Sequence, residues 1–109
     1  MAKTEAQFIS AGVSLDFPLS VLIEIEKETG ENVGAFMSKL DTLAPEAIRL
    51  ALAKGLRNPD GSVWSGDLDK ADFSLRQAAD AALDALFRRV YGRSFSEIAA
   101  DAETKADAA

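Results

Sequence analysis

The sequence predicts a mainly α-helical fold, with one compact domain of four to five helices, and it leaves open a short N-terminal strand or hairpin. Apolar residues recur at helical spacing along most of the chain, and Pro and Gly residues lie where these patterns begin and end. A length of 109 residues suits one domain that buries its core without disulfides or metals. We expect this domain over residues 1–100, followed by a disordered tail over 101–109, which has no large apolar residue.

The segment before Pro18 allows two interpretations. The four residues that begin at Thr4 have the spacing of a capping box, which predicts a short helix over residues 5–11. Val13, Leu15 and Phe17 instead alternate with polar residues, which is the period of a half-buried strand. Both interpretations stay open at the level of the sequence.

Pro18 opens the next helix that the pattern predicts. Proline is favoured at a helix start because its missing N–H has no partner to lose there. The helix is expected from Leu19 to Thr29, with Gly30 as its stop. Its β-branched residues lower the helix propensity, so we expect burial at the centre of the fold to stabilise it.

Two further helices are expected before the middle of the chain. Asn32 is a suitable cap for a short helix from Val33 to Leu40, and Pro45 starts the next. Gly55 has two interpretations: it ends this helix in a left-handed conformation, or it lets another backbone approach closely.

A loop and then the longest helix are expected next. Turn-forming residues mark the loop over residues 57–67, and an apolar stripe predicts a helix over Asp69–Tyr91 that ends at Gly92. The four residues from Ser94 to Glu97 form a capping box that predicts a last short helix.

Glu26 is the charged residue whose position is least expected. At about 100° per residue it falls between Leu19 and Leu22, within the apolar arc of its helix. A buried carboxylate requires a cation, and Arg49 and Arg57 are the candidate partners. The alternative role for Glu26 is to fix the specificity of a partner protein.

The residue types present exclude several kinds of catalytic site. The chain has no histidine and no cysteine, so histidine-based triads, thiol chemistry and the usual zinc sites are excluded. A turn around Gly61 resembles the middle of a calcium loop, but Leu56 occupies the position of the first ligand. Because no nucleophile, oxyanion hole or phosphate loop accompanies the carboxylates, we expect no cofactor, no metal and no enzymatic activity.

The charge of the chain predicts a protein partner. Its 18 acidic and 12 basic residues give a net charge of −6, which repels nucleic acid and anionic lipid. The basic cluster of Arg88, Arg89 and Arg93 is expected to complement a helix dipole. No apolar run approaches the roughly 20 residues of a membrane span, and the N-terminus lacks a signal-peptide pattern, so a cytoplasmic location is expected.

Four aromatic residues are the candidates for contact with that partner. Phe73, Phe87 and Tyr91 are expected on one flank of the long helix, where they can receive a partner's amphipathic helix. Trp64, in the preceding loop, either pins the loop to the core or contacts the partner. If the flank is exposed, it also favours a homo-oligomer.

One short motif resembles a known family. Leu22-Ile23-Glu24-Ile25-Glu26, followed by Thr29-Gly30, is similar to a motif of small tail assembly chaperones from long-tailed phages and gene transfer agents. In that family a strand region precedes the motif, and a short helix and then a helix ending in a Gly-Leu pair follow it. Here Val13 to Phe17 and Gly55-Leu56-Arg57 stand at those places, so the resemblance covers about residues 13–57. The long helix and the helix after it have no counterpart.

The resemblance implies a non-enzymatic chaperone in the cytoplasm of a bacterial host cell, encoded by a phage, a prophage or a gene transfer agent. Such a protein binds the tape measure protein, the tail tube subunits or both before the tail polymerises, and keeps its partner soluble. The alternatives are a small acidic helical adaptor, an antitoxin or inhibitor that mimics nucleic acid charge, or a structural subunit of the particle.

Overall fold

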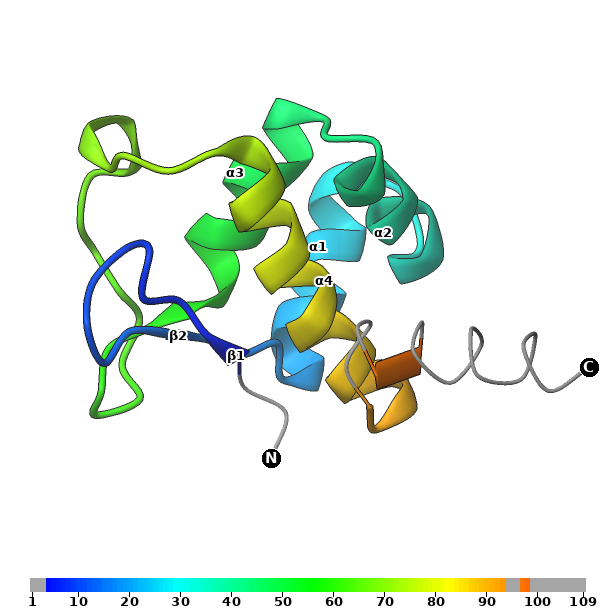
Figure 1. Cartoon of the computed structure of the whole chain (residues 1–109). Coiled ribbons are helices and arrows are strands. Elements are labelled where there is room, and N and C mark those ends of the chain that lie inside the picture. Colours follow the sequence, from blue (N-terminus) through cyan, green and yellow to red (C-terminus); the bar gives the residue numbers. More distant parts are fainter. Residues whose placement is uncertain (1–3, 94–96, 99–109) are drawn as a thin grey trace, which may run out of the picture.

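A computed structural model of the chain describes residues 4–93 and 97–98. Four α-helices and a small three-stranded sheet make up this part of the chain, so the expected mainly α-helical fold is confirmed (Figure 1). The elements in chain order are β1 (Thr4–Glu5), β2 (Ser14–Leu15), α1 (Leu19–Thr29), α2 (Val33–Asp41), α3 (Pro45–Gly55), β3 (Leu56–Arg57), the 3-10 helix η1 (Leu68–Lys70) and α4 (Leu75–Tyr91). Within these ranges no helix is both long enough and apolar enough to cross a lipid bilayer.

The N-terminal residues form a hairpin, and the alternative helix over residues 5–11 is wrong. β2 is the central strand and pairs antiparallel with β1 on one side and β3 on the other. Ala6 N–H donates to the Val13 carbonyl at 2.9 Å, which continues the pairing beyond β1. Both residues are buried together with Leu15 and Phe17, so the burial of this alternating face outweighs the local capping-box signal.

The limits expected for the first three helices are confirmed to within a residue. α1 follows Pro18 and ends at Gly30, which has a left-handed φ of 70°. The Asn32 side chain caps α2 by accepting a hydrogen bond from Ala35 N–H at 2.8 Å. α3 begins at Pro45, as expected.

α4 begins later than the sequence predicts. The helix expected from Asp69 starts at Leu75, and residues 71–74 between η1 and α4 are not helical. The Ser74 hydroxyl accepts a hydrogen bond from Gln77 N–H at 3.0 Å and so satisfies one of the free donors of the first turn. The expected end at Gly92 is confirmed, with a left-handed φ of 78°.

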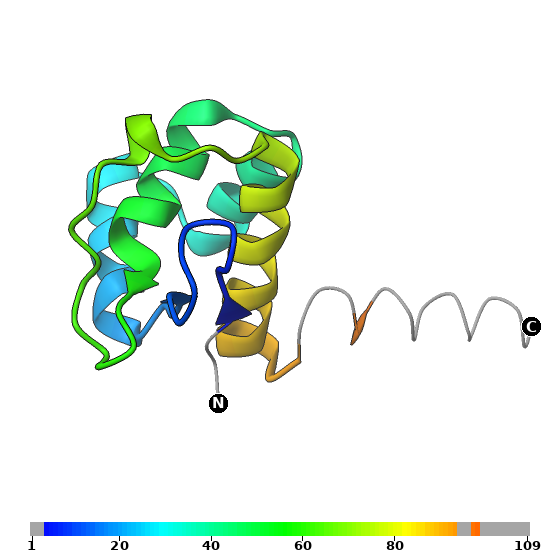
Figure 2. The same ribbon diagram turned by 60° about the vertical axis from the view of Figure 1, so that its left-hand side comes forward.

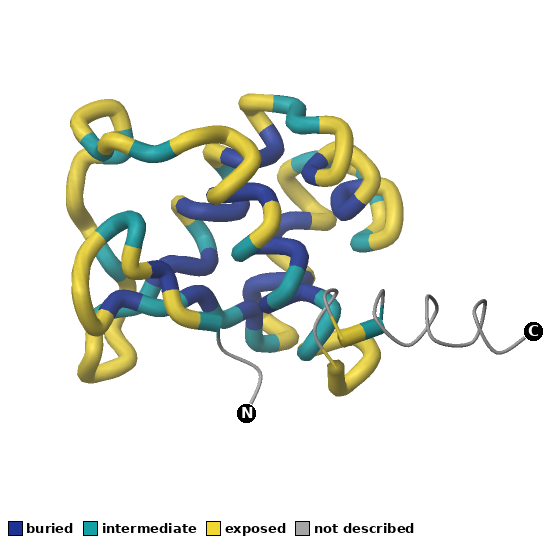
Figure 3. The backbone as a smooth tube through the Cα atoms, in the orientation of Figure 1, coloured by how far each residue is buried: buried dark blue, intermediate teal, exposed yellow. Residues whose placement is uncertain are grey.

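α4, and not α1, is the central helix of the described part. It packs against α2, α3, β1 and β2, and the strands lie alongside both α3 and α4 (Figure 2). Buried stretches of the chain gather where these elements meet (Figure 3). The position expected for α1 at the centre is therefore wrong.

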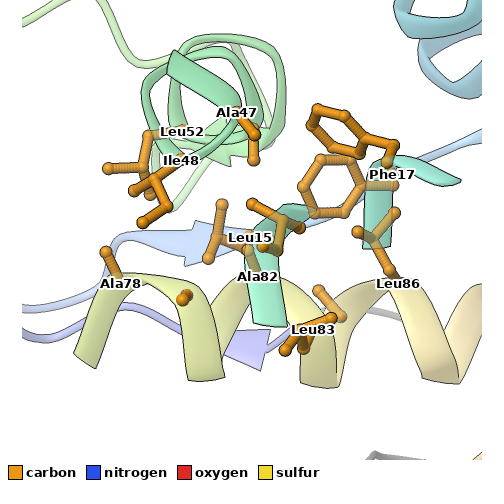
Figure 4. Packing of buried hydrophobic residues seen from close by; sticks show 14 of the residues in the cluster. Leu15, Phe17, Ala47, Ile48, Leu52, Ala78, Ala82, Leu83 and Leu86 are labelled. Carbon is orange, nitrogen blue, oxygen red and sulfur yellow. The ribbon is translucent and has the colours of Figure 1, made fainter. Parts of the chain in front are cut away.

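Small residues on α4 allow this close packing. Ala78, Ala79, Ala82 and Ala85 are fully buried, and short side chains let neighbouring elements approach the helix axis. Larger side chains from α3, from β2 and from the residues after β2 fill the remaining space. Figure 4 shows Leu15, Phe17, Ile48 and Leu52 above Ala78, Ala82, Leu83 and Leu86 of α4.

Two expectations concern residues outside the described ranges. The capping box that begins at Ser94 includes residues 94–96, and the tail occupies residues 101–109. The last short helix and the disordered tail stay predictions.

Candidate protein-binding surfaces

Glu26 is exposed on α1, so its expected burial is wrong. The buried face of α1 consists of Val21, Leu22 and Ile25 alone. Leu19, which was expected to place Glu26 inside the apolar arc, has 68% of its surface exposed. The apolar arc of α1 is wider than the face that the rest of the molecule covers, and Glu26 lies on the uncovered side.

Neither candidate arginine neutralises Glu26. Arg49 is exposed on α3, and its Nη2 lies 3.7 Å from Asp69 Oδ2, an exposed ion pair worth about 0–1 kcal/mol. Arg57 is half-buried in β3, where its Nη1 donates to the carbonyls of Lys54 at 2.9 Å and Leu56 at 3.0 Å. Arg57 therefore satisfies the Lys54 carbonyl in the last turn of α3, which the helix itself leaves without a donor.

Trp64 is half-buried and packs against the core. Its ring covers Gly66 so closely that a β-carbon on Gly66 would overlap it. Its backbone N–H donates to the Leu56 carbonyl at 3.1 Å. These contacts fit the role of an aromatic residue that holds the loop after β3 against the core.

The other three aromatic residues lie in two separate places. Phe73 precedes α4 and packs edge-on against Phe8, with 5.7 Å between the ring centroids. Phe87 and Tyr91 pack against each other near the end of α4 at 5.1 Å, with Phe87 half-buried and 60% of Tyr91 exposed. Since α4 has 17 residues and is about 25 Å long, Phe73 and Tyr91 do not share one surface.

Helix α1 presents an exposed apolar pair that the sequence analysis did not single out. Leu19 and Ile23 lie one turn apart and are 68% and 46% exposed. We call this pair the α1 outer stripe. The width of the apolar arc could have revealed this pair from the sequence. A helix at the edge of a small domain buries one side, so an arc wider than that side leaves apolar residues exposed.

Charged side chains of both signs lie beside the α1 outer stripe, with Glu26 on one side of it and Lys27 on the other. Glu24, Glu26 and Glu28 are all exposed on α1. Lys54 of α3 approaches two of them, with Nζ 3.6 Å from Glu24 Oε2 and 2.8 Å from Glu28 Oε1. The hydrogen bond to Glu28, followed by the charges of both glutamates, raises the pKa of Lys54 above its ordinary value.

A small apolar hollow of about 110 Å³ lies between α3 and the segment that precedes α4. The salt bridge between Arg49 and Asp69 borders it. Its apolar lining consists of Pro45, Ile48, Leu52, Leu68, Phe73 and Leu75. Among the four predicted partner-binding residues, Phe73 is the one that borders this hollow.

The turn after β3 has the local hydrogen bonds of an ordinary turn. Asp60 Oδ1 accepts from the Ser62 hydroxyl at 2.6 Å and from the Ser62 N–H at 2.9 Å. These two bonds, the hydroxyl first, hold the pKa of the Asp60 carboxyl below its ordinary value. Over the described ranges, no group of three or more acidic side chains is placed to hold a metal ion.

Comparison of the chain with protein-family models, with curated protein sequences and with solved structures found no match. No relative therefore assigns a role to any of these surfaces.

Proposed function

We propose that this chain is a tail assembly chaperone of the phage type, which binds the tape measure protein, the tail tube subunits or both in the bacterial cytoplasm. The observation that carries the proposal is the α1 outer stripe. It lies on the same helix as the motif Leu22-Ile23-Glu24-Ile25-Glu26, which resembles that family. The proposed mechanism is binding alone, without a chemical step.

The α1 outer stripe has the features of a surface for a partner helix. Full burial of a leucine or isoleucine side chain stabilises an association by about 1.5–3 kcal/mol. Leu19 and Ile23 are neighbours on one face, so the apolar stripe of an amphipathic helix can cover both at once. The proposed partner segment is therefore a helix from a long helical protein.

The charges beside the stripe favour a particular kind of partner helix. Glu26 and Lys27 lie on the two sides of the apolar pair, whereas Glu24 and Glu28 lie farther round the helix, beside Lys54 of α3. A helix that carries a basic side chain on one side of its apolar stripe and an acidic side chain on the other would match Glu26 and Lys27. The net charge of −6 also keeps copies of the chaperone apart and soluble.

The order of the elements also supports the proposal. The resemblance implies a strand, a helix, a short helix and a helix that ends in a Gly-Leu pair. The described residues contain β2, α1, α2 and α3 in this order, and Gly55 is the last residue of α3.

A co-expression experiment tests the proposal. The chain is tagged and expressed together with the long helical protein encoded beside it, and with a scrambled version of that protein. The wild-type chain should enrich the long protein over the scrambled one. Replacement of the stripe by Leu19→Ser together with Ile23→Ser should lower this enrichment about tenfold or more, because it removes the apolar contact.

Val63→Ser is the matched control. Val63 is also exposed, but it lies in the loop after β3, so its replacement removes apolar surface elsewhere. Equal enrichment by the wild type and the stripe variant would contradict the role of the stripe. Failure of the wild type to enrich the long protein would contradict the chaperone function. Recovery of the chain in purified particles would favour a structural subunit, and capture of a toxin encoded in an overlapping gene would favour an antitoxin.

A further inference from the structure

The outer face of the sheet carries a polar pocket of about 660 Å³. Glu5, Ser14 and Arg57 are directly paired across the three strands, so their side chains share one face of the sheet. Leu15 and Leu56, next along the strands, are buried on the opposite face. The pocket therefore lies over a row of polar residues with the core on the other side.

The hollow in this face has a simple steric origin. Ser14 on the central strand is short, whereas Glu5 and Arg57 on either side are long, so the middle of the row is the lowest point. The turn after β3 forms a wall, with Pro59 so close to Gly12 that a β-carbon there would lie 2.9 Å from Pro59 Cγ. Arg88, from the last turn of α4, completes the lining.

Most of the charged groups around the pocket already have partners. Asp16 Oδ1 accepts from Arg89 Nη2 at 3.2 Å, and Glu5 Oε2 accepts from Gln7 Nε2 at 3.2 Å. Arg57 donates from Nη1 to two backbone carbonyls, and its other N–H groups stay available as donors to a ligand.

Arg88 is the exception. Within the described part of the chain its guanidinium has no ion-pair or hydrogen-bond partner, and its Nε is enclosed without an acceptor. Because protein atoms cover this Nε, a ligand in the pocket would accept hydrogen bonds from the terminal Nη1 and Nη2 groups, which have no acceptor among the described residues. An arginine is well suited to this because its planar fork matches a carboxylate.

We infer that this pocket binds a carboxylate through Arg88. The lining carries two guanidinium groups, those of Arg57 and Arg88, and two carboxylates, those of Glu5 and Asp16. Because these charges balance, a monoanion fits the pocket better than a dianion such as phosphate. Glu5 keeps one free carboxylate oxygen, which favours a ligand with a hydroxyl or N–H group beside its own carboxylate.

Two sources can supply this chemistry: a free α-hydroxy acid, or an acidic side chain of another polypeptide beside its own backbone N–H. The pocket is separate from the α1 outer stripe, and the inference does not depend on the proposed chaperone function.

An NMR titration of the full, ¹⁵N-labelled chain tests the inference. The probes are lactate, N-acetyl-glutamate N-methylamide and inorganic phosphate, all at constant ionic strength. At least one of the two carboxylate probes should shift the backbone amide resonances of Ser14 and Asn58, and the shift should saturate as the probe concentration rises. The probe that saturates at the lower concentration identifies the source, whether free acid or peptide.

The variant Arg88→Gln should weaken this binding about tenfold or more, because it removes the charge-assisted hydrogen bonds. Arg76→Gln is the matched control, since it removes the same charge from the opposite end of α4, where Arg76 pairs with Asp80. Ser14→Gln should also weaken binding, because it fills the hollow without a change of charge.

Three outcomes would overturn the inference. The first is the absence of a saturable shift at Ser14 and Asn58 with either carboxylate. The second is an equal loss of binding in Arg88→Gln and Arg76→Gln, which would indicate general charge attraction. The third is phosphate binding as tight as that of the carboxylates.

Discussion

Gly55 shows how a distant side chain fixes the identity of one residue. It is the last residue of α3, and a β-carbon there would lie 2.5 Å from Phe17 Cζ and 3.1 Å from Leu15 Cδ2. Gly55 is not among the glycines with positive φ, so the left-handed interpretation is wrong. Close approach is the correct reason: the Asp16 N–H donates to the Gly55 carbonyl at 2.9 Å, and the Phe17 ring occupies the space that a side chain would need.

We therefore expect Gly55→Ala to lower the free energy of unfolding by about 1–3 kcal/mol, because Phe17 is fully buried and has little room to move. Urea denaturation measures the change. Gly34→Ala in α2 is the control, since its nearest neighbour is Asn32 Oδ1 at 3.4 Å. Alanine should be neutral there or stabilise the helix by up to about 1 kcal/mol. An equal loss in both variants would contradict the steric explanation.

At the scale of the element, the start of α4 depends on a competition between two helix signals. Asp67 accepts a hydrogen bond from Asp69 N–H at 3.0 Å and begins only the 3-10 helix η1. The chain then leaves the helical conformation, Phe73 packs against Phe8, and Ser74 caps α4. A continuous helix from Asp69 would satisfy the apolar periodicity equally well. The sequence pattern alone therefore cannot distinguish a helix that starts at Asp69 from one that starts at Leu75.

The variant Ser74→Ala distinguishes a helix that starts at Leu75 from one that starts at Asp69, because the change in the free energy of unfolding has opposite signs in the two cases. At the N-cap, loss of the hydroxyl should destabilise the protein by about 1 kcal/mol. In the interior of a helix that began at Asp69, alanine would instead stabilise it by about 0.5 kcal/mol. Thermal or urea denaturation gives the sign, and a stabilised variant would contradict the observed start of α4.

At the scale of the whole molecule, α4 is the helix that links the others. It contacts α2, α3 and two strands of the sheet, and its buried residues come from one continuous face. Its C-terminal end is also tied to the segment after β2 through Arg89 and Asp16, whose Nη2 and Oδ1 lie 3.2 Å apart. Loss of packing on α4 should therefore affect the entire domain and not one layer of it.

Leu86→Ala tests this role. Leu86 is fully buried, so its truncation should lower the free energy of unfolding by about 2–5 kcal/mol while the transition stays cooperative. Leu75→Ala at the exposed start of the same helix should cost much less, since 43% of Leu75 is already exposed. Comparable losses in the two variants would argue against α4 as the central helix.

The candidate surfaces could be predicted from the sequence only in part. Phe87 and Tyr91 were expected at the end of the long helix and lie there. The α1 outer stripe was missed because Leu19 and Ile23 have the same apolar character as the buried Leu22 and Ile25. The pocket over Ser14 was missed because it needs the register of three strands, two of them far apart in the sequence.

The sequence by itself determined the fold class and the limits of the first three helices. Pro18, Gly30 and Asn32 act through their own backbone and capping chemistry, so these limits need no distant partner. Only the tertiary structure decided that the N-terminal segment is a hairpin, that α4 starts at Leu75, and that one side of α1 stays uncovered. The physical reason is that burial depends on elements far away in the chain, and a local pattern states what can be buried but not what covers it.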